Sequence, residues 1–170
     1  MGQFPTSFDQ DDLIRCARGE LFGPGNAQLP EPPMLMMHRI TDISSDGGSH
    51  GKGHVVAEFD ITPDLWFFNC HFPNNPIMPG CLGLDALWQL TGFNLGWRGW
   101  EGRGYALGVG EVKLTGMVRP DRKLLKFVVE FSKAVKTRRL TMGVAEGRVE
   151  ADGDPVCQVK DMKVALSASD

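Results

Sequence analysis

Alternation of apolar and polar residues predicts β-strands along much of the chain. Residues 54–61 alternate as a half-buried strand does, and residues 125–131 place leucine, phenylalanine and valine on one face between polar side chains. Asp152-Gly153 is a dipeptide favoured in tight hairpins and separates two of the predicted strands. The remaining strands are predicted at 34–44, 105–118, 139–150 and 156–166, and the glycines of the second permit a bulge or a close backbone approach.

Two segments depart from this alternation and predict helices. Residues 10–18 form a short helix with Asp9 as its N-cap, and residues 21–33 after it are rich in glycine and proline, as loops are. The segment 80–98 is long enough for about five helical turns. Its apolar residues surround the helix, which predicts burial on all sides. We therefore expect an α+β fold, in which one long central helix is wrapped by a curved, mostly antiparallel sheet.

Length and composition are those of a globular protein. At 170 residues, with 42% hydrophobic and 23% charged residues, the chain predicts a single domain over residues 1–170, with 1–33 as an N-terminal helix and loop extension. Its four cysteines lack the density of a secreted disulfide scaffold, which predicts reduced thiols and a cytoplasmic location. The N-terminus has no basic stretch followed by an apolar one, so no secretory signal peptide is predicted. Residues 65–84 contain no Asp, Glu, Lys or Arg, but their prolines and polar side chains argue against membrane insertion.

Charge is distributed unevenly. The net charge of −3 gives no case for nucleic acid as a partner. Residues 113–139 nevertheless hold nine of the 18 lysines and arginines, against two acids, Asp121 and Glu130. Such a segment fits a docking face for an acidic partner. It fits equally well a solvated strand surface whose charges are balanced by distant acids.

One acidic residue stands inside the apolar helix. Asp85 has leucine, alanine and tryptophan as its neighbours, and burial of a carboxyl group favours the protonated form. A protonated acid in apolar surroundings is what general acid catalysis near neutral pH requires. Gln89 lies one turn later on the same face and is placed to hold Asp85 by a hydrogen bond. A structural carboxylate, paired with an arginine or capping a backbone group, fits the same position.

His71 precedes this helix in a segment rich in phenylalanine and proline. Histidine is the usual side chain for proton transfer near neutral pH, although a histidine beside aromatic residues also occurs in purely structural roles. Pro79-Gly80 begins the helix, and first-turn N–H groups lack intrahelical acceptors at the positive end of the helix dipole. Such donors suit a thioester carbonyl that gains enolate character when a neighbouring proton is removed. A Pro-Gly pair that merely ends a loop gives the same sequence.

Other chemistry fits these residues less well. Cys70, His71 and Cys81 offer three zinc ligands, but residues 70 and 71 are adjacent and no CxxC pair completes a structural site. Cys70 as a nucleophile with a histidine base lacks a third, orienting group. The Gly-x-Gly at 108–110 begins a dinucleotide fingerprint, but Lys113 stands where the third glycine belongs. No metal and no cofactor are therefore expected.

Five runs of the sequence carry a resemblance that extends over nearly the whole chain. They are ELFG (20–23), MLMM (34–37), DLWFF-x-CHF (64–72), P-x-MPGCLGLDA-x-WQL (76–90) and LGVGEVK (107–113). Together they closely resemble the bifunctional 3-hydroxydecanoyl-acyl-carrier-protein dehydratase/isomerases of bacterial unsaturated fatty acid synthesis. The block from 64 to 90 is the most specific. The resemblance implies a hot-dog fold and a homodimer with two shared active sites, each built from the histidine of one subunit and the aspartate of the other.

The resemblance also implies residue roles. The catalytic histidine falls on His71, the catalytic aspartate on Asp85, and the amide that binds the thioester carbonyl on Gly80. We count Gly80, Cys70 and Gln89 as substrate-binding residues. Relatives that only dehydrate usually have glutamate in place of Asp85, which favours the bifunctional branch. The sequence departs from the family at residue 38, where histidine replaces a common aspartate and leaves any local ion pair open.

The implied activity is dehydration of a (3R)-3-hydroxyacyl thioester to the trans-2-enoyl product, followed by isomerisation to the cis-3 product. The resemblance favours a decanoyl-length chain, carried on the phosphopantetheine of acyl carrier protein. Three alternatives stay open: a dehydratase without isomerase activity, a hot-dog acyl thioesterase, and a non-catalytic acyl-thioester sensor.

Overall fold

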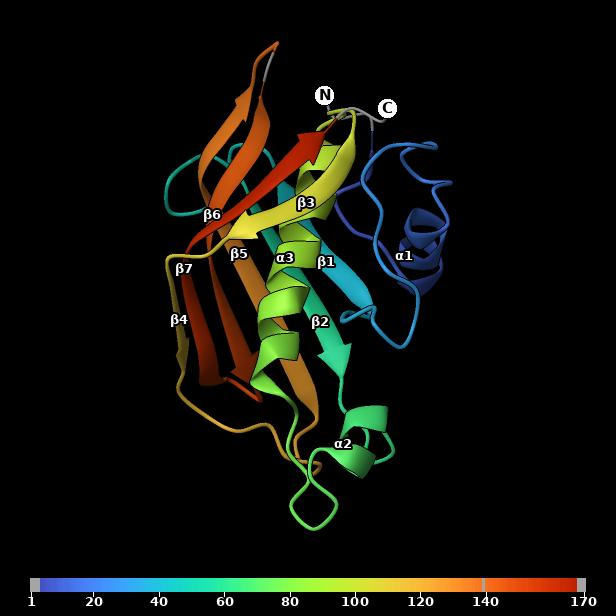
Figure 1. Ribbon diagram of the computed structural model, residues 1–170, viewed down its shortest axis with the longest axis vertical. Coiled ribbons are helices and arrows are strands. Elements are labelled where there is room, and N and C mark those ends of the chain that lie inside the picture. Colours follow the sequence, from blue (N-terminus) through green and yellow to red (C-terminus); the bar gives the residue numbers. More distant parts are fainter. Residues whose placement is uncertain (1–3, 139, 168–170) are drawn as a thin grey trace.

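The computed structural model describes residues 4–138 and 140–167, and a long helix lies against a curved antiparallel sheet (Figure 1). The sheet has seven strands in the order β1-β2-β5-β6-β7-β3, and β4 also pairs with β7. The predicted α+β architecture is therefore confirmed. The elements are α1 (Gln10–Ala17), β1 (Arg39–Ser44), β2 (His54–Asp60), α2 (Trp66–Cys70), α3 (Gly80–Trp97), β3 (Arg103–Gly108), β4 (Glu111–Leu114), β5 (Leu124–Lys136), β6 (Thr141–Ala151) and β7 (Asp154–Ser167).

The hairpin between β6 and β7 forms where its turn residues predict. Asp152 and Gly153 both have positive φ, 51° and 90°, which suits the tight turn of a two-residue hairpin. The Asp152 carboxylate accepts hydrogen bonds from the backbone N–H groups of Lys123 and Leu124, at 3.1 and 2.9 Å. These bonds attach the turn to the start of β5.

Two strand predictions need correction. The strand expected over 34–44 begins only at Arg39, because residues 34–36 use backbone groups in a turn and in hydrogen bonds to a side chain of α3. The segment 105–118 is divided into β3 and β4, which both pair with β7. An irregularity in register between Ala106 and Gly108 marks the expected bulge. The short helix α2 was not expected from the sequence.

The N-terminal extension belongs to the same core as the sheet. Asp9 caps α1 as the sequence predicts, and Asp12 completes a capping box that was not predicted. The Trp97 indole N–H donates to the Pro5 carbonyl at 2.7 Å. A Cβ at Gly96 would lie 2.8 Å from the Phe22 ring, so glycine is what lets the extension pack directly on the end of α3.

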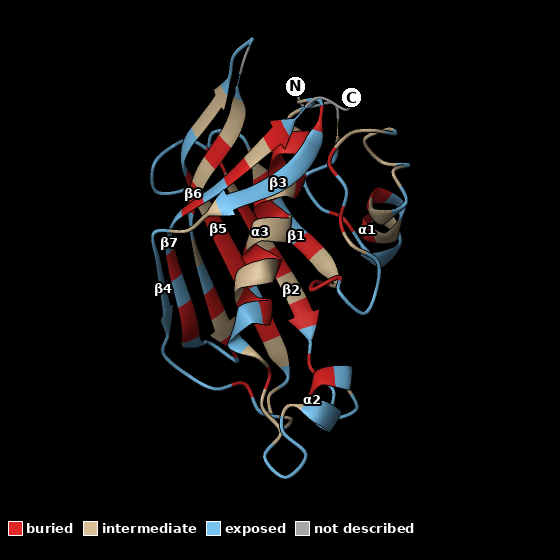
Figure 2. Ribbon diagram, viewed as in Figure 1, coloured by how far each residue is buried: buried red, intermediate tan, exposed pale blue. Residues whose placement is uncertain are grey.

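The helix α3 is buried on most of its surface but not on all sides, and that prediction is wrong along one stripe. Ala86, Leu87 and Leu90 are fully buried toward the sheet. A stripe on the other side is exposed or half-buried and consists of Cys81, Leu84, Asp85, Trp88, Gln89 and Gly92. Figure 2 shows these partly exposed turns on the same side of the molecule as the exposed strand β3. An apolar helix surface is covered by its own sheet or by another molecule, and composition does not distinguish the two.

No helix within residues 4–138 and 140–167 has both the length and the apolar character needed to cross a membrane.

Candidate active site

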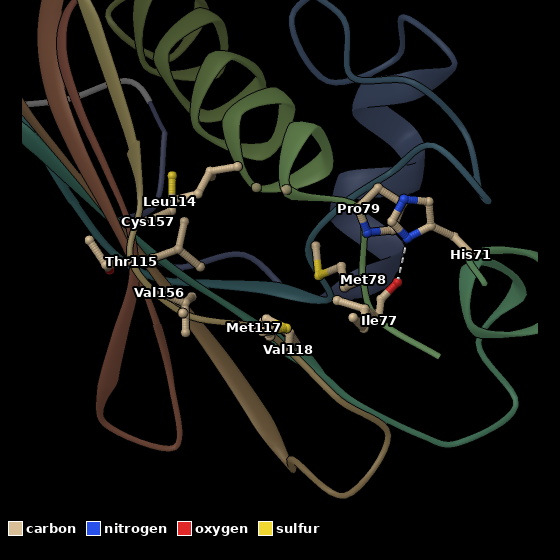
Figure 3. Close-up of a pocket in the computed structure, with 14 residues that line it drawn as sticks. His71, Ile77, Met78, Pro79, Leu114, Thr115, Met117, Val118, Val156 and Cys157 are labelled. Atoms are coloured by element: carbon tan, nitrogen blue, oxygen red, sulfur yellow. Dashed lines mark hydrogen bonds between the residues drawn. The ribbon is translucent and has the colours of Figure 1, made fainter. Parts of the chain in front are cut away.

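A mostly apolar cavity of about 350 Å³ lies beside the N-terminus of α3 (Figure 3). One wall is the 77–80 segment and the first turn of α3, and another is the connection 114–118 after β4. The inner faces of β6 and β7 contribute Val149, Val156 and Cys157. His71, which is half-buried, also lines the cavity. A cavity of this size and lining suits an acyl chain better than a polar substrate.

The backbone sets the tautomer of His71. Its Nδ1 lies 2.8 Å from the carbonyl oxygen of Ile77, as the dashed line in Figure 3 shows. A carbonyl oxygen only accepts, so Nδ1 carries a hydrogen, and in the neutral imidazole it is Nε2 that keeps the lone pair. The Ile77 N–H in turn donates to the His71 carbonyl at 2.8 Å, which closes the loop between them. The ring of Phe72 stacks on the imidazole with centroids 4.1 Å apart. His71 is thus held in the form that a general base requires.

Gly80 lines the same cavity at the start of α3. Its N-cap residue is Pro79, which makes no side-chain capping bond in the described chain. The Leu82 N–H donates to the Pro79 carbonyl at 3.0 Å, which leaves the N–H of Gly80 as a first-turn donor that can meet a ligand at the positive end of the helix. A Cβ at Gly80 would lie 2.6 Å from Cδ1 of Leu114, so the absence of a side chain keeps the helix start close to the 114–118 wall. The structure therefore brings two of the predicted residues, His71 and Gly80, to one cavity.

Asp85 lies on another face of the helix. At 3.6 residues per turn it projects roughly 140–160° around the axis from Gly80 and Gly83, which line the cavity. It is half-buried, so the expectation of a carboxyl group sealed in apolar surroundings is wrong for the single chain. Among the described residues that line the cavity, Asp85 is not found. One chain alone therefore does not place His71 and Asp85 at a common cavity.

Gln89 holds Asp85 as expected. Its Nε2 donates to Oδ2 of Asp85 at 2.6 Å and to the Met34 carbonyl at 2.8 Å. The Met36 N–H donates to Oε1 of Gln89 at 3.1 Å. The side chain thus bridges the exposed stripe of α3 and the segment that precedes β1.

The cysteines divide into two pairs. Cys70 is exposed, with Sγ 3.6 Å from the Trp66 carbonyl oxygen, and its role in substrate binding stays a prediction. Cys81 is also exposed, whereas Cys16 and Cys157 are buried, and all four thiols are free. Burial raises the pKa of Cys157. Sequence reasoning missed Cys157 and the 114–118 wall, whose apolar residues carry no local signal of a cavity.

No group of three or more His, Cys, Asp or Glu side chains gathers as a metal site would within the described residues.

His38, at which the sequence departs from the family, is held by a hydrogen bond and ring stacking. Its Nδ1 accepts from the Asp60 N–H at 2.9 Å, its ring stacks on Phe59, and burial lowers its pKa. The local ion pairs belong instead to Arg39, whose guanidinium lies 2.8 Å from Glu58 and 2.7 Å from Asp60. These bonds raise the pKa of Arg39, and the same guanidinium lowers the pKa of Asp60.

The basic segment 113–139 spans the 13-residue strand β5, which itself carries Lys126, Lys133 and Lys136, and it has a basic group near each end of that strand. Lys136 and Arg138 lie at the end that projects as a hairpin in Figure 1, and Arg139 lies outside the described residues. At the other end Arg119 donates to Oδ1 of Asn75 at 3.1 Å, beside the loop that carries His71. Docking of an acidic partner at either group stays a prediction.

Comparison with known proteins identifies the fold. The model of a family described as FabA-like domain matches residues 29–160. The dehydratase heterocomplex ApeI:P from Xenorhabdus doucetiae has a similar structure, with 16% identity over 82% of this chain and 87% of that chain and a TM-score of 0.59. A hypothetical thioesterase with coenzyme A from Streptococcus pneumoniae TIGR4 shares 17% identity over 76% of this chain and 85% of that one, with a TM-score of 0.54. These likenesses confirm the hot-dog fold.

Proposed function

Because the chain belongs to the FabA-like domain family, we propose that it is a dehydratase of 3-hydroxyacyl thioesters. The observation that carries the proposal is the apolar cavity at which His71, with a free Nε2, meets the open N-terminus of α3 at Gly80. A base beside an apolar channel and a hydrogen-bond donor for a carbonyl are the parts that proton abstraction next to a thioester needs.

In the proposed reaction, Nε2 of His71 takes a proton from C2 while the thioester oxygen accepts a hydrogen bond from Gly80 N–H. The electron pair of the C2–H bond forms the C2–C3 double bond, and the C3–O bond breaks. Asp85 gives its proton to the departing hydroxyl, which leaves as water. The proton on His71 then returns to Asp85 through that water, and both groups are ready for another turnover. For isomerisation, His71 moves a proton from C4 to C2.

Asp85 reaches this reaction from a second copy of the chain. The half-buried stripe of α3 that contains it faces away from the cavity of its own chain. Strand β3 lies at the end of the sheet order, and Tyr105 and Leu107 on it are 52% and 57% exposed. Unpaired sheet edges with large apolar side chains are suited to pairing with another strand. Our proposal is a homodimer in which each cavity combines His71 of one subunit with Asp85 of the other.

The finer assignments rest on the sequence resemblance. They are a decanoyl-length substrate on acyl carrier protein, and isomerase activity, which Asp85 favours over the glutamate of relatives that only dehydrate. A basic surface suits the acidic carrier.

Incubation of the protein with a 3-hydroxydecanoyl thioester tests the proposal. We expect the trans-2-enoyl and cis-3-enoyl products from the wild type and neither from His71→Ala. The matched control His50→Ala changes an exposed histidine on a surface loop and keeps full activity. Enoyl product without the cis-3 isomer identifies a dehydratase alone, free acid identifies a thioesterase, and binding without turnover identifies a sensor. Either free acid or binding without turnover would contradict the proposed function.

A further inference from the structure

We propose that Gln89 is a positioning residue that aims the acid of the reaction, by tying one oxygen of Asp85 and leaving the other to carry the proton. The inference rests on the proposed function and adds a residue that acts through Asp85. It also gives the segment 34–36 a part in catalysis, because two backbone groups of this segment hold Gln89.

The orientation of the Gln89 amide follows from the backbone. The Met36 N–H can only donate, so the atom 3.1 Å from it must be the amide oxygen. The Met34 carbonyl can only accept, so the atom 2.8 Å from it must be the amide nitrogen. The two backbone groups lie two residues apart in the chain and require the same orientation. A flipped amide would lose both bonds.

This orientation directs a donor at Asp85. The amide nitrogen has two hydrogens, one for Met34 and the other for Oδ2 of Asp85, 2.6 Å away. Because Oδ2 accepts that hydrogen bond, a neutral Asp85 carries its proton on Oδ1. The acidic hydrogen is thereby confined to one oxygen, and the carboxyl group cannot rotate without losing the Gln89 bond. Positioning of this kind is what lets a general acid act within hydrogen-bond reach of a leaving group.

Gln89 also anchors the segment before β1 to α3, so a test must separate this structural role from an effect on the acid. Two substrates distinguish the structural role of Gln89 from its effect on the acid. Loss of water from a 3-hydroxydecanoyl thioester needs a proton for the leaving hydroxyl. Loss of chloride from a 3-chlorodecanoyl thioester does not, since His71 takes the C2 proton and the C3–Cl bond breaks with its electron pair on chloride. A defect confined to the first reaction therefore reports on the acid.

We expect Gln89→Met, which keeps the shape of the side chain without its donors, to lower kcat for water loss about 30-fold with KM within about twofold of wild type. Its rate of chloride loss, after subtraction of the uncatalysed rate, stays within about twofold of wild type. Gln89→Glu retains an acceptor for the Met36 N–H and therefore keeps one of the two backbone bonds that anchor the segment. It shows the same selective loss, so the test does not depend on how well Gln89→Met folds.

Three controls complete the experiment. Asp85→Asn loses water elimination and keeps chloride elimination, whereas His71→Ala loses both. Gln28→Leu, which removes a comparable glutamine-to-backbone bond to the Ala17 carbonyl (3.1 Å), changes neither. Wild-type rates of water loss in Gln89→Met, or equal losses on both substrates, would overturn the positioning role. A wild-type protein that dehydrates nothing would instead overturn the proposed function on which the inference rests.

Discussion

The buried thiol of Cys16 makes the stability of the fold depend on pH in a way that can be measured directly. Cys16 lies on α1 and is 1% exposed. Burial raises its pKa from 9.0 to about 12, although a hydrogen bond from the Leu29 backbone opposes the shift. In the unfolded chain the thiol ionises near the ordinary value of 9.0. The folded state therefore holds a proton that the unfolded state releases between these two values.

This difference in pKa decides how the free energy of unfolding changes with pH. The stabilisation is fully present below pH 9, since both states are then protonated, and it is lost as pH rises toward 12. Each pH unit in this window costs about 1.4 kcal/mol, so the whole window costs about 4 kcal/mol. The variant Cys16→Ala lacks this dependence. At neutral pH it is less stable than wild type by about 1–2 kcal/mol, because it loses the packing of the sulfur.

Urea unfolding of both proteins, followed by tryptophan fluorescence from about pH 7 to about pH 11 under reducing conditions, gives the difference in stability at each pH. Titration of lysines, tyrosine and the other cysteines cancels in this difference. We expect the two stability curves to cross about one pH unit above 9.0, with the variant more stable beyond the crossing. A difference that stays constant up to pH 11 would refute the reasoning, because the thiol would then ionise equally in both states.

Three further predictions concern the core, the proposed dimer and the carrier. Leu87→Ala removes a fully buried side chain that packs where Gly147 has no Cβ, and we expect a loss of about 2–5 kcal/mol in urea unfolding; a loss under 1 kcal/mol would contradict this packing. Leu107→Asp places a charge on exposed β3 and should give an inactive monomer in light scattering, whereas Leu140→Asp, another exposed leucine outside β3 on the β5–β6 hairpin, leaves an active dimer. Arg138→Glu should weaken turnover of carrier-bound substrate about fivefold in a salt-sensitive manner and spare small thioesters; equal losses on both substrates would exclude a docking role.

The features that the sequence predicts well are those decided locally. Strand and helix periodicity, the Asp9 cap and the Asp152-Gly153 turn depend on neighbours a few residues apart, and all of them appear in the structure. The strand predicted from residue 34 fails because a distant side chain, Gln89, takes the backbone bonds that a strand would need. The helix α2 has five residues, too few for a periodic signal.

The same distinction between local and distant interactions applies to the residues of the site. His71 and Gly80 flank one short loop, so their proximity could be predicted from the chain itself. The opposite wall of the cavity depends on the register of β4 against β7, which pairs Leu114 with Cys157. No sequence pattern near either residue predicts that pairing. The exposure of Asp85 could not be predicted either, because an apolar helix that meets a second molecule has the same composition as one that is buried in its own chain.

Mixing two inactive variants tests most directly whether each active site is shared between subunits. His71→Ala and Asp85→Asn are each unfolded, mixed in equal amounts and refolded together, so that half of the dimers contain one chain of each kind. In such a dimer one cavity carries both defects and the other carries neither. We predict that dehydratase activity returns to about a quarter of the wild-type value. A mixture that remains as inactive as the separate variants would contradict the account, because His71 and Asp85 would then act within a single chain.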